Sequence, residues 1–190
     1  MSFRELVEKR YSCRRYESAG VEREKINECV KAARSAPSAC NAQPWRFLVI
    51  DDPGVLEGAC AAAVSGVYRM SRFIKGAPVL IAVLADKGSF LSKMGSLVRD
   101  AGFYLIDIGI ACEHLVLQAS ELGLGTCYVG WFNEKALKKN LGIPKKLRVP
   151  LLISMGYPSE EYRKKDPIRR RAGSETRKDL KEILYFNSLR

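Results

Sequence analysis

The sequence is poor in the residues that hold metals or form hydrolytic triads. Its 190 residues include one histidine, His114, and none of the six cysteines stands in a C-x-x-C pair. Zinc sites draw on clustered cysteine and histidine ligands, so we expect no metal. His114 falls inside a long helix-like segment, where a packing or interface role is favoured over catalysis. The cysteines lie mostly in apolar surroundings and resemble small buried hydrophobic residues.

Acidic residues are too few to balance the basic ones. There are 21 Asp and Glu against 32 Lys and Arg, which gives a formal net charge of +11. An excess of this sign suits an anionic partner, and nucleic acid, acidic lipid headgroups and phosphorylated small molecules all qualify. Solubility alone is an equally good explanation at this point.

Long apolar runs and phosphate-binding glycine loops are also missing. No run reaches the roughly 18 apolar residues of a membrane helix. The first residues, MSFRELVEKR, are charged from Arg4 onward and lack the apolar centre of a signal peptide. We therefore expect a cytoplasmic protein with reduced thiols and no membrane contact. The glycine-rich stretch LGLGTC at 122–127 lacks the Lys-Ser/Thr ending of a P-loop.

What the sequence does contain is an alternation of helix-like and strand-like segments. Hydrophobic residues make up 47% of the chain, enough for one core. With no internal repeat or long linker, we expect one domain over 1–190, in which about 160–190 form a C-terminal arm. The irregular crossovers favour an α+β fold over a doubly wound sheet. Expected helices cover 3–10, 22–34, 54–63, 97–122, 133–144 and a late segment from about 175; expected strands cover 45–53, 77–86, 126–131 and 148–158.

The segment from Leu97 to Leu122 has the strongest periodicity, with apolar residues at every third or fourth position. It also carries small residues, among them Gly102, Gly109 and Ala111, in greater number than the surface of a small monomer requires. This pattern indicates a long helix that packs on another helix across a subunit interface, and hence a homodimer.

Arginines and a hydroxyl alternate near the start of the chain, in RYSCR. In an extended segment Arg10, Ser12 and Arg14 point the same way, because alternate strand residues share a face. Two guanidinium groups beside a hydroxyl can bind a phosphate through charge-assisted hydrogen bonds. Taken alone, this stretch is more often a solvated basic turn.

The loop SAPSACNAQPWRF, residues 35–47, combines two prolines with an Asn and a Gln. The amides of Asn41 and Gln43 offer donors and acceptors that match the edge of a heterocyclic ring. Pro37 and Pro44 stiffen the loop and lower the entropy lost on binding. A plain Asx-type turn with Trp45 in the core is the alternative. A third segment, DPIRRRAGSE at 166–175, is by itself best taken as a charged surface.

Taken in order, these segments resemble the nitroreductase family of FMN enzymes. The matching stretches are RYSCRRY, SAPSACNAQPWRF, APVLIAVLAD, DIGIACEHLVLQASELGLGTCYVGWF and VPLLISMGYP, followed by a basic tail. The resemblance spans nearly the whole chain. It implies an α/β sandwich with a central, mostly antiparallel sheet flanked by helices, a long helix at the dimer interface and a C-terminal arm that reaches the partner subunit. FMN is then expected at the subunit interface, with NADH or NADPH as electron donor.

The resemblance also assigns residues to the cofactor. Arg10 matches the family's phosphate-binding residue, and Arg14 matches the basic residue near the flavin's pyrimidine edge. Pro37, Ser38 and Asn41 match the loop that wraps FMN, often from the partner subunit. No side chain is assigned as a certain catalytic group, but Arg14 and Gly130 are expected to tune the flavin. The full expected cofactor-binding set is Arg10, Tyr11, Ser12, Arg14, Pro37, Ser38, Asn41, Gln43, Val129, Gly130, Arg169 and Arg171.

The implied activity is reduction of nitroaromatic, quinone or related small acceptors by NAD(P)H in a ping-pong sequence. Alternatives on the same scaffold are flavin reduction, enone reduction and dehalogenation. A flavin-binding module without turnover is a further alternative. A nucleic-acid-binding protein is less favoured, because it should interleave aromatics with its Lys/Arg runs. The stretch between Gly58 and Ser96 is compact for the family. Because that stretch normally supplies the lid and substrate pocket, the acceptor stays open.

Overall fold

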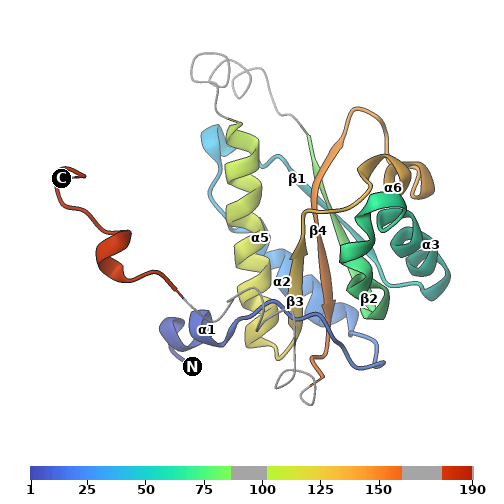
Figure 1. The fold of residues 1–190 in the computed structure, drawn as a ribbon, viewed down its shortest axis with the longest axis horizontal. Helices are drawn as coiled ribbons and strands as arrows, with labels where there is room; N and C mark the ends of the chain where they lie inside the picture. The colour runs from blue at the N-terminus through green and yellow to red at the C-terminus, as the bar shows by residue number, and fades with distance from the viewer. Residues whose placement is uncertain (87–101, 160–176, 190) are drawn as a thin grey trace. The chain divides into compact units, whose positions relative to one another are not determined.

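A computed structural model describes residues 1–86, 102–159 and 177–189 of the chain (Figure 1). The chain divides into two units, Met1–Ser159 and Glu160–Arg190, which are described separately below. The first unit contains the sheet, its covering helices and most of the candidate site.

Four antiparallel strands form one sheet in the order β1-β2-β4-β3. The strands are β1 (Trp45–Ile50), β2 (Val79–Ala85), β3 (Gly125–Val129) and β4 (Arg148–Gly156). All seven residues of β2 are buried, as expected for a central strand that is covered on both faces. The predicted α+β class and antiparallel sheet are therefore confirmed.

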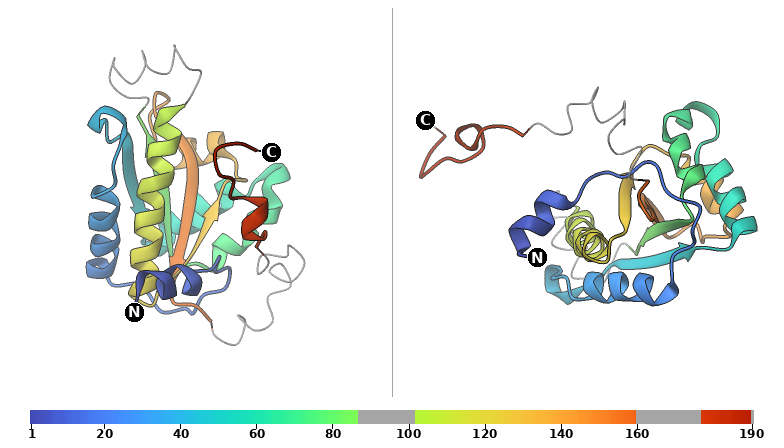
Figure 2. Two further views of the ribbon diagram at one scale, coloured as in Figure 1. Left: turned by 90° about the vertical axis from the view of Figure 1, so that its left-hand side faces the viewer. Right: turned by 90° about the horizontal axis from the view of Figure 1, so that it is seen from below.

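Helices cover both faces of the sheet (Figures 1 and 2). On one face, α2 (Arg23–Arg34) and α5 (Phe103–Glu121) pack against Val79, Ile81 and Val83 of β2. The opposite face of β2 packs with α3 (Pro53–Ala63), the 3₁₀ segment η2 (Gly66–Gly76) and α6 (Glu134–Asn140). The alternation of β2 side chains thus divides the core into two layers.

The helix boundaries follow local capping chemistry. The Asp52 side chain accepts a hydrogen bond from the Val55 N–H, and Pro53 occupies the first turn of α3. Ser2 and Glu5 form a capping box at the start of α1 (Phe3–Lys9). Asn133 caps α6 by accepting from the Ala136 N–H. The starts of these three helices lie within about two residues of those expected from the sequence.

The central helix α5 is long and apolar enough to cross a membrane by length and composition. Core helices pass the same test, and α5 buries Ile108, Ala111, Cys112, Leu115 and Val116 among its residues. Its predicted first turns, from Leu97, lie outside the described residues. On its other side Leu105 and Ile106 are 47% and 56% exposed.

The described part of the second unit, residues 177–189, is exposed throughout. The late helix predicted from about Glu175 is reduced there to the 3₁₀ turn η3 (Leu180–Glu182). Short isolated helices are marginal because nucleation is costly and tertiary packing supplies most of their stability. Within this unit Leu180, Ile183, Leu184, Tyr185 and Phe186 expose their apolar side chains.

Candidate functional site

The N-terminal basic segment lies along β3, which is an edge strand of the sheet. Ser12 forms a parallel bridge with Thr126, and the Cys13 N–H donates to the Thr126 carbonyl over 2.8 Å. The Tyr16 hydroxyl then donates to the Cys13 carbonyl over 2.6 Å. The extended conformation predicted for this segment is therefore fixed by backbone contacts with the sheet edge.

Arg10, Ser12 and Arg14 all influence the Cys127 side chain. Burial raises the pKa of the Cys127 thiol to about 11, while the two guanidinium groups and a hydrogen bond from Ser12 oppose that rise. The thiol itself stays protonated near neutral pH, which argues against Cys127 as a nucleophile.

Arg14 also contacts η2, on the opposite face of the sheet from α5. Its guanidinium carbon lies 5.9 Å from the centre of the Phe73 ring, within the range of a cation–π contact. The Ser71 hydroxyl donates to the Trp131 carbonyl over 2.6 Å. The Tyr68 and Trp131 rings lie 5.2 Å apart at an interplanar angle of 50°. The segment just beyond β3 therefore packs against η2 through Tyr68 and Ser71.

Val129 and Gly130 end β3 beside these aromatic side chains. Val129 is buried, whereas Gly130 is exposed, and a Cβ added at Gly130 would meet nothing within 4 Å. Trp131, the next residue, is 55% exposed. The Gly130 backbone is therefore open to approach on the side where a Cβ would stand.

The loop from Pro37 to Gln43 forms the second part of the predicted site. Cys40, Asn41 and Gln43 have φ values of 53°, 52° and 43° in the left-handed region, which is unfavourable for residues with a side chain. Hydrogen bonds within the loop support this backbone: the Gln43 N–H donates to Ser38 Oγ, and Gln43 Nε2 donates to Asn41 Oδ1, each over 3.0 Å. Such strain is concentrated at functional sites.

A buried carboxylate anchors this loop to α5. Asp107 is only 5% exposed, and its Oδ1 accepts the Ala39 N–H over 3.0 Å. Its Oδ2 is buried and has no hydrogen-bond partner among the described residues. Sequence reasoning missed Asp107, although a lone acidic residue within the apolar run YLIDIGIA was a visible signal. Trp45, which follows the loop, is 9% exposed and packs in the core.

The two parts of the site border opposite edges of the sheet. The loop leads into β1, whereas the Arg10–Arg14 segment borders β3, and two strands separate β1 from β3. Three interstrand steps of about 4.8 Å place these edges roughly 14 Å apart. One copy of the chain therefore does not bring the loop amides next to the arginines.

Other predicted features have a structural explanation or lie beyond the described ranges. His114 is half-buried, and its Nδ1 lies 3.3 Å from the Ala32 carbonyl oxygen, so it packs α5 against α2. No group of three potential metal ligands occurs within residues 1–86, 102–159 and 177–189. Arg169 and Arg171 lie outside the described residues. Tyr68, Phe73 and Trp131 were missed because their aromatic side chains read as ordinary core residues.

Comparison with known proteins decides the family. The model of the nitroreductase family matches residues 7–157. This chain belongs to that family. A relative from Archaeoglobus fulgidus, provisionally named NADH dehydrogenase/NAD(P)H nitroreductase, is 32% identical over 160 residues, which cover 82% of this chain and 85% of the relative. The iodotyrosine deiodinase of Thermotoga neapolitana is 26% identical over 176 residues, which cover 82% of this chain and 88% of that protein.

A solved structure agrees with this assignment. The FMN-dependent nitroreductase of Clostridium difficile R20291 is 28% identical and superimposes with a TM-score of 0.72. The match covers 97% of this chain and 98% of that structure. The predicted nitroreductase-like fold is therefore confirmed.

The described residues suit FMN as a nitroreductase cofactor. Its phosphate needs cations and hydroxyl donors, and the extended segment along β3 contains both types of group in Arg10 and Ser12. Its ring needs an open, flat approach, which Gly130 offers at the end of β3. The unsatisfied Asp107 Oδ2 also shows that the loop end of α5 has hydrogen-bonding capacity that the described residues do not use.

Proposed function

We propose that this nitroreductase-family protein is an FMN-dependent oxidoreductase that uses NADH or NADPH to reduce nitroaromatic, quinone or related small acceptors. The observation that carries the proposal is the set of Arg10, Ser12 and Arg14 that influence Cys127 from a segment fixed along β3, with the open Gly130 three residues beyond Cys127. When bound, FMN supplies the redox chemistry, since it takes a hydride from the nicotinamide and passes electrons to the acceptor.

The protein residues in this proposal bind and tune the cofactor. Arg10 and Ser12, with Arg169 and Arg171 from the C-terminal arm, hold the phosphate. Arg14 lies toward the ring, where its charge favours the more negative form of the cofactor. Tyr11 supports the segment between them, and Val129 and Gly130 present backbone groups to the ring edge. The aromatic side chains of Tyr68 and Trp131 offer a surface on which a planar acceptor can stack.

We further propose that the working unit is a homodimer in the cytoplasm, with one domain per chain. The loop of one copy, with Pro37, Ser38, Asn41 and Gln43, would complete the site next to the arginines of the other copy. The separation of these groups across the sheet supports this arrangement, and so do the exposed Leu105 and Ile106 on α5. The apolar side chains between Leu180 and Phe186 suit docking of the arm on the partner subunit.

Reductive dehalogenation is the second candidate activity. It is favoured by the similarity to the iodotyrosine deiodinase of Thermotoga neapolitana. Both activities need the same cofactor site, and they differ only in the acceptor. A panel of nitroaromatics, quinones and halogenated phenols, offered to the reduced enzyme without oxygen, would separate them.

The simplest experiment on the cofactor is optical. The purified protein should be yellow, release FMN on denaturation, and lose its colour when NADH or NADPH is added without oxygen. A yellow protein that neither nicotinamide bleaches would be a flavin-binding module. A colourless protein that shifts DNA in a gel mobility assay would instead indicate that the arginines bind nucleic acid.

A further inference from the structure

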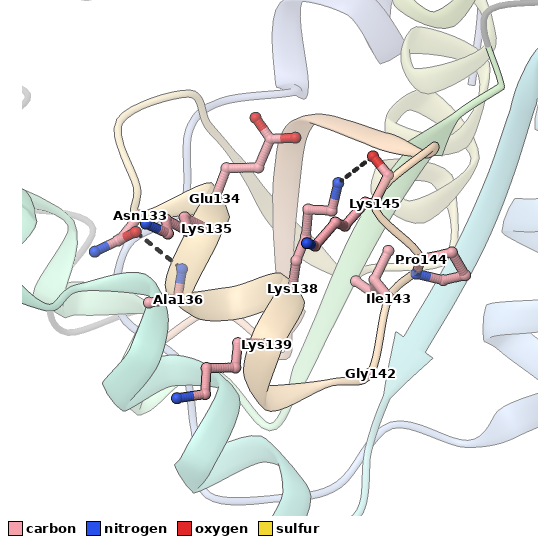
Figure 3. Close-up of a pocket in the computed structure, with 10 residues that line it drawn as sticks. All are labelled: Asn133, Glu134, Lys135, Ala136, Lys138, Lys139, Gly142, Ile143, Pro144 and Lys145. Carbon is pink, nitrogen blue, oxygen red and sulfur yellow. Dashed lines mark hydrogen bonds between the residues drawn. The ribbon is translucent and has the colours of Figure 1, made fainter.

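A second positively charged site lies just beyond the candidate flavin site, between α6 and the loop that follows it. Residues 133–148 contain five lysines, one arginine and one glutamate, so this segment holds five of the eleven excess positive charges. A groove of about 1070 Å³ opens there (Figure 3). Small-molecule sites usually measure about 300–1,000 Å³, so the groove has room for a ligand of nucleotide size.

The walls of the groove combine apolar surface with cations. Ala136 on α6 and Ile143 and Pro144 on the facing loop provide the apolar part (Figure 3). Lys135, Lys138, Lys139 and Lys145 also line the groove. A ligand with a flat apolar body and negative groups would match such a lining, whereas a flat macromolecular surface would not enter it.

The only acidic side chain of the groove is already neutralised. Glu134 Oε1 lies 3.3 Å from Arg148 Nε and accepts the Val149 N–H over 2.9 Å. By contrast, the ammonium groups of Lys135, Lys139 and Lys145 form no ion pair with another described residue. The groove therefore attracts anions without an internal carboxylate to compete.

One of the cations is held in place before any ligand arrives. Lys138 Nζ donates to the Lys145 carbonyl over 3.1 Å, as the dashed line in Figure 3 shows, and also to the Leu147 carbonyl. These bonds tie the end of α6 to the facing loop and leave one ammonium proton for a ligand. The conformational entropy of the Lys138 side chain is therefore lost during folding and not when a ligand binds.

The groove also lies close to the predicted flavin edge. Asn133, its first residue, follows Gly130 by three positions, and three residues span at most about 11 Å. A dinucleotide whose nicotinamide reaches the flavin beside Gly130 must place its phosphates some distance away along the protein surface. The groove offers such a basic concavity on the segment that follows Gly130.

We propose that this groove binds the adenosine phosphate half of the nicotinamide dinucleotide donor. The inference rests on the proposed function, because it names where the same reaction holds its electron donor. Lys135, Lys139 and Lys145 contact the phosphates, Lys138 fixes the shape of the groove, and Ile143 and Pro144 pack against the adenosine.

The test compares two exposed lysines, each in the last turn of its helix. Lys139→Gln removes a groove charge on α6, and Lys31→Gln removes the same charge on α2, on the opposite face of the sheet. In the FMN-loaded protein, ADP binding is measured by calorimetry at low salt, together with flavin reduction by NADH and by reduced nicotinamide mononucleotide, which has no adenosine half.

We expect Lys139→Gln to weaken ADP binding roughly two- to fivefold, as for an exposed ion pair, and to raise the NADH concentration for half-maximal reduction equally. The triple change of Lys135, Lys139 and Lys145 to Gln should weaken both about tenfold or more. The mononucleotide and the Lys31→Gln protein should be unaffected.

Three results would overturn the proposal. The first is ADP binding that the triple variant retains. The second is an equal loss for NADH and the mononucleotide, which would mean a general electrostatic effect. The third is DNA binding by these lysines without ADP binding. Failure of both NADH and NADPH to reduce the wild-type flavin would instead contradict the proposed function, so the two ideas fail in different experiments.

Discussion

The two parts of the candidate flavin site are built in different ways. The Arg10–Arg14 segment is an extension of the sheet, tied to Thr126 by backbone pairing. The loop from Pro37 to Gln43 has three left-handed residues and is anchored by one hydrogen bond to the buried Asp107. The first part is held by backbone pairing with the sheet, whereas the second depends on a few polar contacts. Changes in the two parts should therefore have different signatures.

The largest effect should come from removing the C-terminal arm. Deleting the residues after Glu175 removes the exposed Leu180, Ile183, Leu184, Tyr185 and Phe186, which we propose to dock on the partner subunit. We expect a weaker dimer and a large loss of bound FMN, because each site would need both chains. Sedimentation velocity and flavin content measure the two losses. A truncated protein that stays dimeric and fully loaded with FMN would contradict arm docking.

Replacing Arg10 by Ala should have the next largest effect, and it tests the rigid part of the site. Loss of one charge-assisted hydrogen bond, about 1.5–3 kcal/mol, would lower FMN affinity roughly ten- to a hundredfold. Riboflavin, which lacks the phosphate, should bind Arg10→Ala as it binds the wild type. Arg171→Ala should behave in the same way. Equal losses for both flavins would show that these arginines do not bind the phosphate.

A smaller effect is expected from Asp107→Ala, which tests the loop. This change leaves the Ala39 N–H without its acceptor, at a cost of about 1–3 kcal/mol. The loop should become more mobile, so FMN and riboflavin should lose affinity to the same extent. Asp107→Asn keeps an oxygen acceptor and serves as the matched control, with a smaller loss.

Cys40 provides a direct readout for the loop. It is the only exposed cysteine of the six, so an alkylating reagent should label it first. FMN should protect Cys40 in the wild type and protect it less in Asp107→Ala. Burial raises the pKa of Cys29 and Cys112 to about 12 and that of Cys60 to about 11, so their thiols should stay unreactive up to about pH 9. If FMN left the alkylation of Cys40 in the wild type unchanged, the loop would not be part of the flavin site.

The smallest expected effect concerns Arg14, which separates tuning from binding. Arg14→Gln keeps hydrogen-bond donors but removes the charge. Because a cation stabilises the reduced, more negative flavin, the midpoint potential should fall by tens of millivolts. About 30 mV corresponds to roughly 1.4 kcal/mol for a two-electron couple. Redox titration measures the shift. An unchanged potential with weaker binding of oxidised FMN would make Arg14 a binding residue only.

Much of the fold follows from local patterns. The apolar run APVLIAVLAD predicted a strand covered on both faces, and β2 is that strand. The segment that holds Arg10, Ser12 and Arg14 was likewise expected to be extended, and it pairs with β3. The late C-terminal helix was wrong within the described residues, because its exposed side chains find no surface there to pack against.

The amino-acid sequence by itself determined the family, the antiparallel sheet and the extended conformation of the N-terminal basic segment. These features depend on residue type and spacing, which are local. Only the tertiary structure decided that Asp107 holds the loop, that Phe73 lies under Arg14 and that the lysines around α6 border a groove. It also showed that the loop and the arginines occupy opposite sheet edges. Strand order brings distant segments together or keeps them apart, and no local pattern encodes that order.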